Sequence, residues 1–128
     1  KQYYSEELIE IFIFEMYLRK RMLELAEQIM NSKDPEVIGL QAGRKGIVNV
    51  YVNLIITMIR NQEKTEAFSP RQLKKLINKV AISLEENLKY LDPDSKLKIS
   101  AEIKQTSEKS SSEYLKKTND KMLKLLGN

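Results

Sequence analysis

The organisation of this chain depends on one nearly apolar stretch, Gly46-Ile-Val-Asn-Val-Tyr-Val-Asn-Leu-Ile-Ile-Thr-Met-Ile-Arg-Asn61. Within it, polar residues recur every four positions, at Asn49, Asn53, Thr57 and Asn61. On an α-helix this spacing gives one narrow polar stripe on a rod that is otherwise apolar. Such a helix has to be covered by neighbours on most sides, so the sequence predicts a helical bundle built around this segment.

Helix-start signals divide the rest of the chain. Asp34-Pro35, Ser69-Pro70 and Asp92-Pro93 each place a capping residue before a proline, which is tolerated in the first turn because its missing N–H is not needed there. Ser5, followed by two glutamates, is a fourth start. We therefore expect an all-α, antiparallel four-helix bundle, with residues 1–128 as a single domain and helices near 5–32, 35–61, 70–91 and 95–126.

The predicted helices differ in the quality of their apolar pattern. The third is the clearest, with one apolar stripe at Leu73, Leu76, Ile77, Val80, Leu84, Leu88 and Leu91. The last is expected to be the weakest, because its stripe is thin and Ser110-Ser111-Ser112 lowers its helix propensity. Residues 9–13, 48–54 and 97–103 also alternate with period two, so a mixed fold is the alternative. Scarce glycine and the lack of Asn-Gly or Asp-Gly turns favour helices.

Composition limits the chemistry that this chain can perform. It has 128 residues, of which 41% are hydrophobic and 31% charged, as in a soluble globular domain with its own core. It has no cysteine and no histidine, which removes thiol nucleophiles, imidazole bases and Cys/His zinc sites. Phosphate-loop, dinucleotide-binding, nucleophile-elbow and EF-hand motifs are also absent. We expect a non-enzymatic protein with no catalytic residue, cofactor or metal site.

The sequence gives little information on cellular location. Polar residues such as Glu10, Glu15, Asn49 and Asn53 interrupt the apolar runs, so no transmembrane segment is expected. Because the chain begins with Lys rather than Met, we expect that its start has been removed, and a cleaved targeting segment stays an open alternative.

The first helix has apolar residues on more than one side. The face expected to meet the core contains Leu8, Ile11, Phe12, Leu18, Met22, Ala26, Ile29 and Met30. Ile13, Phe14 and Tyr17 fall on the opposite face, where either the bundle covers them or they form a surface for self-association. Glu15 and Arg19 project into the apolar face, as an ion pair at a bundle edge or as a buried pair that fixes register.

Small residues gather before the apolar stretch. Gly39, Gly43 and Gly46 are unexpected within a helix, since each costs about 1 kcal/mol relative to alanine. With Asn49 and Asn53 they form a smooth face, which is a second candidate contact if another helix packs closely there. A loop at residues 42–46 explains the glycines equally well.

Positive charge is concentrated in the second half of the chain. Residues 1–68 have 9 basic and 10 acidic groups, a net charge of −1, and residues 69–128 have 13 and 8, a net charge of +5. A solvated lysine-rich surface is the simplest explanation. The alternative is a sequence-independent nucleic-acid interface that uses Arg44, Lys45, Arg71, Lys74, Lys75 and Lys79.

The leading functional hypothesis is a structural or assembly protein that forms a homo-oligomer or packs into a larger complex, filament or particle. Nucleic acid is the alternative partner, and a membrane partner is not expected. A third hypothesis is a bundle that acts through its lysine-rich tail, residues 113–128, on a membrane surface or as an inhibitor.

Overall fold

A computed structural model describes residues 2–31, 33 and 43–127, and this part of the chain contains five α-helices and no strand. The helices are α1 (Glu6–Met30), α3 (Arg44–Arg60), α4 (Pro70–Asn87), α5 (Pro93–Lys109) and α6 (Glu113–Leu125). Two short 3-10 helices, η2 (Asn61–Glu63) and η3 (Leu88–Tyr90), follow α3 and α4. The predicted all-α helical bundle is confirmed.

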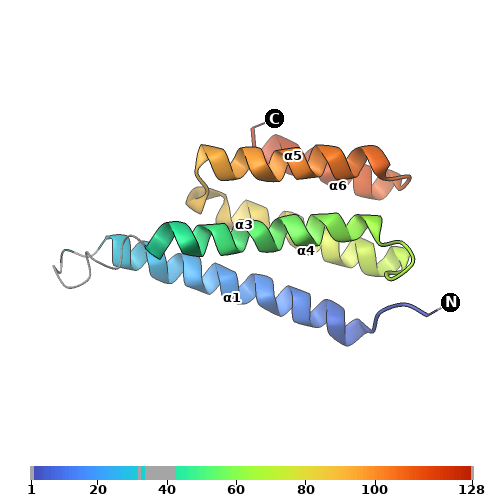
Figure 1. The fold of residues 1–128 in the computed structure, drawn as a ribbon, viewed down its shortest axis with the longest axis horizontal. Helices are drawn as coiled ribbons and strands as arrows, with labels where there is room; N and C mark the ends of the chain where they lie inside the picture. The colour runs from blue at the N-terminus through green and yellow to red at the C-terminus, as the bar shows by residue number, and fades with distance from the viewer. Residues whose placement is uncertain (1, 32, 34–42, 128) are drawn as a thin grey trace.

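The helices lie in three layers with consecutive helices antiparallel (Figure 1). Helix α1 forms one edge of the molecule, α3 and α4 form the middle layer, and α5 and α6 form the opposite edge. Helix α1 contacts both middle helices, while α3 packs against α5 and α4 against α6. The outward side of α1 is therefore the side that no other layer covers.

The predicted fourth helix, near 95–126, is two helices in the structure. Helix α5 ends where Ser110 takes an extended conformation, and Ser112 caps the start of α6 by accepting a hydrogen bond from the Leu115 backbone N–H at 3.3 Å. Serine hydroxyls compete with helical hydrogen bonds and favour such ends, so the three-serine run that was expected to weaken one helix separates two.

The starts of α4 and α5 agree with the capping signals in the sequence. Ser69 and Gln72 form a reciprocal capping box, with N···O distances of 3.1 and 2.8 Å. At α5, the Ser95 backbone N–H donates to Asp92 at 2.7 Å, and this hydrogen bond lowers the pKa of the Asp92 carboxyl. Helix α3 begins at Arg44 with Gly43 as its cap, whereas Asp34-Pro35 lies outside the described residues.

One continuous core connects the three layers. The α4 stripe from Leu73 to Leu84 is buried as expected, and it belongs to one core cluster with apolar side chains of the other described helices. Among them are Ile9 and Met16 of α1, Ile55 and Met58 of α3, Ile99 and Ile103 of α5, and Leu115 and Met122 of α6. Burial of these side chains supplies most of the stability that fixes α1 on the middle layer.

Polar contacts join α3 to α4 within this core and α3 to α5 at its edge. The hydroxyls of Tyr51 in α3 and Ser83 in α4 are 2.8 Å apart, and Asn87 Nδ2 lies 3.4 Å from the same Tyr51 oxygen. Between α3 and α5, Arg60 Nε donates to the buried carboxylate of Glu102 at 2.7 Å. Both contacts satisfy buried polar groups and fix the helices in one register.

Candidate interaction surface

Helix α1 has apolar residues on two opposite faces. Its inner face buries Ile9, Met16, Leu23 and Ala26 against α3 and α4. Five further large apolar side chains remain between 37% and 57% exposed, namely Ile11, Phe14, Leu18, Met22 and Leu25, and we call them the outer stripe. At 100° per residue, they lie on the side of the helix opposite the inner face.

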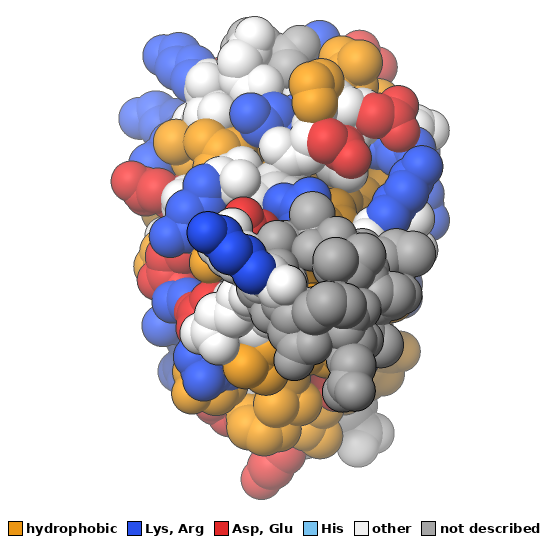
Figure 2. All heavy atoms as spheres, turned by 90° about the vertical axis from the view of Figure 1, so that its left-hand side faces the viewer, with side chains coloured by type: hydrophobic (Ala, Val, Ile, Leu, Met, Phe, Trp, Pro, Cys, Tyr) orange, Lys and Arg blue, Asp and Glu red, His pale blue; other side chains and the backbone are white. Residues whose placement is uncertain are grey.

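The outer stripe is the main exposed apolar surface of the described chain. Of its twelve exposed large hydrophobic side chains, eight lie between Tyr3 and Leu25. Figure 2 shows hydrophobic side chains gathered at the lower end of the molecule, which is the side on which α1 lies in Figure 1. Contiguous apolar patches of this kind mark interaction sites in soluble proteins, whereas isolated exposed residues do not.

Ion pairs attach α1 to the middle layer beside the outer stripe. Three of them join a glutamate of α1 to a cation of α3 or α4. In the fourth the charges are exchanged, because Lys20 of α1 pairs with Glu86 of α4. The N···O distances are 2.5 Å for Glu10–Lys75, 2.7 Å for Lys20–Glu86, 3.1 Å for Glu27–Arg44 and 3.9 Å for Glu6–Arg71. At 100° per residue these four charged residues of α1 lie on one side of the helix, so they form a polar rim along one border of the stripe.

The segment before α1 is also fixed to the bundle. The Tyr4 backbone N–H donates to the Ala67 carbonyl at 2.7 Å, and the Tyr4 carbonyl accepts from Gln72 Nε2 at 2.6 Å. The Tyr4 ring meets the buried Phe68 edge to face, with ring centroids 5.0 Å apart. The start of α1 is therefore held in place, and with it the direction that the outer stripe faces.

The structure separates the three aromatic and aliphatic residues that the sequence grouped on α1. Phe14 and Tyr17 are each more than half exposed, whereas Ile13 is partly buried and packs against the core. Ile13 and Tyr17 line a shallow groove of about 270 Å³ between α1 and α4, together with Ile82 and Lys79 of α4. Of the three, only Phe14 belongs to the outer stripe.

The expected core face of α1 was wrong for three residues. Ile11, Leu18 and Met22 are exposed, and the core contacts come from Ile9, Met16 and Leu23. Seven-residue spacing does not distinguish the two faces, because Ile11, Leu18 and Leu25 on the outer side repeat as Ile9, Met16 and Leu23 do on the inner side. The Met30 side chain lies outside the described part.

Glu15 and Arg19 form an ion pair at the helix surface. Their N···O distance is 3.3 Å, and both side chains are about one-third exposed. The edge ion pair is therefore the alternative that the structure supports.

The glycine and asparagine face of α3 is open to solvent. Gly43, Gly46, Asn49 and Asn53 are all exposed, and a Cβ built on either glycine meets no heavy atom within 4 Å among the described residues. Gly43 caps α3 and Gly46 lies in its first turn, so residues 44–46 are helical rather than loop. Gly39 lies outside the described residues.

The six cations of the nucleic-acid alternative do not form one cluster. Arg44 and Lys45 lie at the start of α3, whereas Arg71, Lys74 and Lys75 lie at the start of the antiparallel α4, at the opposite end of the molecule (Figure 1). Arg44, Arg71 and Lys75 pair with carboxylates of α1, and Lys74 Nζ lies 5.1 Å from the centre of the Tyr114 ring. Lys79 lines the groove beside Tyr17.

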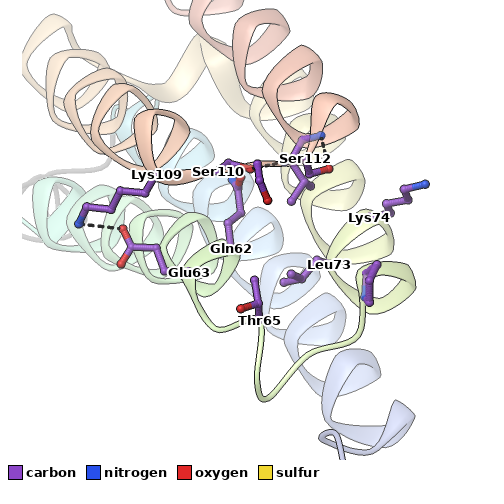
Figure 3. A pocket seen from close by; sticks show the side chains of 11 residues that line it. Gln62, Glu63, Thr65, Leu73, Lys74, Lys109, Ser110 and Ser112 are labelled. Carbon is purple, nitrogen blue, oxygen red and sulfur yellow. Dashed lines mark hydrogen bonds and ion pairs between the residues drawn. The ribbon is translucent and has the colours of Figure 1, made fainter.

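A second hollow lies at one end of the bundle, where η2, the start of α4 and the α5–α6 connection meet (Figure 3). This cavity of about 460 Å³ is lined by serines, threonine and two lysines. Lys109 pairs with Glu63 at 3.3 Å, and Gln62 exchanges two hydrogen bonds with the buried Asn119 at 2.9 and 3.0 Å. Lys109, Glu63 and Gln62 are therefore already engaged within the chain.

Metal-binding clusters and membrane-spanning helices are absent from the part of the chain that the structure describes. No group of three or more Asp and Glu side chains in this part of the chain is arranged to hold a metal ion. Within the same residues, no helix is both long enough and apolar enough to cross a bilayer. Comparison with protein-family models, curated proteins and solved structures gave no match to this chain.

Proposed function

We propose that this protein is a non-enzymatic structural subunit that associates with copies of itself through the outer stripe of α1. The observation that supports this proposal is the second apolar face of a helix whose first face already packs on the bundle. A helix that served only to close one edge of the bundle would have polar residues on its outward side. Instead, five large apolar side chains there stay 37% to 57% exposed in the described structure.

The size of the outer stripe is close to the lower limit for a specific contact. A large apolar side chain has a surface on the order of 200 Å² when it is fully accessible. The five residues of the outer stripe are about half exposed, so together they offer roughly 500 Å² of apolar surface per copy. Two copies together therefore bury on the order of 1,000 Å² at the stripe alone, which is about the lower limit for a specific protein interface. The polar rim beside the stripe adds to this area.

A nucleic-acid interface has less support from the same contacts. Three of its six cations, Arg44, Arg71 and Lys75, are committed to carboxylates of α1, so phosphate would have to compete with those ion pairs. The two groups of cations also lie at opposite ends of the bundle. We therefore favour the assembly function.

Light scattering of the purified chain tests the proposal. We expect the wild-type chain, of 14.9 kDa, to have a native mass that is a multiple of this value at a concentration of about 100 µM. Phe14→Glu places a charge in the middle of the outer stripe, where its desolvation opposes association. This variant should have the mass of a monomer and keep the helical circular dichroism of the wild type.

Leu97→Glu is the matched control. Leu97 on α5 is 62% exposed, close to the 57% of Phe14, but it lies in the opposite layer. The native mass of Leu97→Glu should equal that of the wild type. A wild-type mass of 14.9 kDa at every concentration would refute the proposed function.

A further inference from the structure

We infer that the assembly is a closed two-fold dimer in which α1 packs antiparallel against α1 of a second copy, with Leu18 facing Leu18 at the symmetry axis. This inference rests on the proposed function and names its partner, symmetry and register. It predicts a discrete pair rather than a filament, because a two-fold contact uses the same surface on both copies and leaves none free.

The spacing of the outer stripe is symmetric about its centre. Ile11 and Leu25 lie seven residues on either side of Leu18, and Phe14 and Met22 lie four residues on either side. When the helix is reversed about Leu18, each apolar residue therefore meets another one. Ile11 faces Leu25 of the second copy, and Phe14 faces its Met22. A flexible methionine is well suited to pack against an aromatic ring.

Among the surfaces of the described chain, the outer stripe of a second copy is the one best suited to cover the outer stripe. The exposed large hydrophobics outside residues 3–25 are Val50, Ile82, Leu97 and Tyr114, and they belong to four different helices. No other described surface has apolar residues in a continuous row, so a head-to-tail contact would bury the stripe against polar groups. Pairing the stripe with itself buries both apolar surfaces together.

The charges of α1 favour the antiparallel orientation. Residues 6–15 contain four glutamates and no cation, a net charge of −4, whereas residues 21–30 contain one arginine and two glutamates, a net charge of −1. A parallel pair would place the two −4 segments side by side. An antiparallel pair centred on Leu18 places each −4 segment beside a −1 segment, which lowers the repulsion between the copies.

The ion pair beside the stripe also fits this register. Glu15 and Arg19 are four residues apart on one border of the helix, and a two-fold axis perpendicular to both helices brings the same borders together. With Leu18 facing Leu18, Arg19 of one copy is level with position 17 of the other, about 3 Å along the axis from Glu15. Each Glu15 can therefore accept hydrogen bonds from Arg19 of the second copy.

Cysteine cross-linking tests the register, and the chain suits this method because it has no cysteine of its own. Leu18→Cys should form a cross-linked dimer with a short bis-maleimide, at a yield at least tenfold above that of Leu97→Cys. Ile11→Cys alone and Leu25→Cys alone should stay at the Leu97→Cys level, because identical positions lie about 21 Å apart along the paired helices. An equimolar mixture of these two variants should cross-link efficiently.

Other patterns separate this inference from the proposed function. Efficient cross-linking of Ile11→Cys with itself indicates a parallel pair and overturns the inference alone. An assembly of native mass above 14.9 kDa in which neither Leu18→Cys nor the mixture cross-links indicates a different contact, with the same consequence. A monomeric mass with no cross-linking overturns both the inference and the proposed function.

Discussion

Among single residues, Tyr51 places a titratable hydroxyl in the core. Its side chain is fully buried between α3 and α4, with its hydroxyl 2.8 Å from that of Ser83. Burial disfavours the phenolate and raises the pKa of Tyr51 to about 12, although hydrogen bonds from Ser83 and Asn87 oppose the increase. The native protein therefore keeps this proton at pH values where the unfolded chain has lost it.

This difference predicts a loss of stability at high pH. An unfolded tyrosine titrates near pH 10, so the unfolded state binds fewer protons than the native state between pH 10 and about pH 12. The free energy of unfolding should be unaffected by Tyr51 below pH 10 and should fall above it, by on the order of 2–3 kcal/mol at pH 12. Urea unfolding at pH 8, 10 and 11.5 measures the decline.

Tyr51→Phe identifies the residue responsible. It should cost about 1 kcal/mol at pH 8, where the hydrogen bonds to the hydroxyl are lost, and it should make the decline above pH 10 shallower. Tyr114→Phe, which changes an exposed ring, is the control and should retain the wild-type decline. An equally steep decline in Tyr51→Phe would contradict the assignment.

At the scale of helices, sequence reasoning succeeded for α4 and failed for α1, for one physical reason. Helix α4 has a single apolar stripe among lysines, so only one face can be buried, and Leu73 to Leu84 are buried as predicted. Helix α1 has two apolar faces, and periodicity gives no preference between them. Only the tertiary contacts show that Ile9 and Met16 face inward while Ile11 and Leu18 face outward.

The candidate site was predictable in part. The sequence indicated surplus apolar surface on α1, and Phe14 and Tyr17 are exposed, but three stripe residues, Ile11, Leu18 and Met22, were assigned to the core. For the glycine and asparagine face of α3, the sequence suggested a close contact that the described structure does not contain. Small residues suit both close packing and exposure, and the described structure leaves Gly46 and Asn49 open to solvent.

Gly46→Ala tests whether α3 is closely approached on this face. Gly46 is helical and a Cβ there meets no described heavy atom within 4 Å, so alanine gains helix propensity without a clash. The free energy of unfolding should rise by about 0.5–1 kcal/mol, as measured in urea. Gly127→Ala is the contrasting variant: its φ of 89° strains alanine, so stability should not rise. Destabilisation by Gly46→Ala would show that another helix packs on this face.

At the scale of the whole molecule, the three layers have different roles in the proposed assembly. The middle layer, α3 and α4, contacts both outer layers and contributes most to the core. Helix α1 has one face on that layer and one face outward. The same helix therefore contributes to the stability of each copy and to the contact between copies. Any contact that covers the outer stripe should therefore also oppose detachment of α1 from the bundle.

This coupling predicts that thermal stability depends on protein concentration. If native chains associate through α1 and unfolded chains do not, a tenfold increase in concentration stabilises each mole of dimer by about 1.4 kcal/mol. For a chain of this length, the corresponding rise in Tm is about 2–3 °C per tenfold increase, measured by circular dichroism between 1 and 100 µM.

Leu18→Glu places two carboxylates at the proposed symmetry axis, so its Tm should be lower than that of the wild type and independent of concentration. Leu97→Glu should retain the wild-type dependence, since Leu97 lies on the layer opposite α1. A wild-type Tm that is constant over this range would mean that α1 is held by its own bundle alone, with the outer stripe left in water.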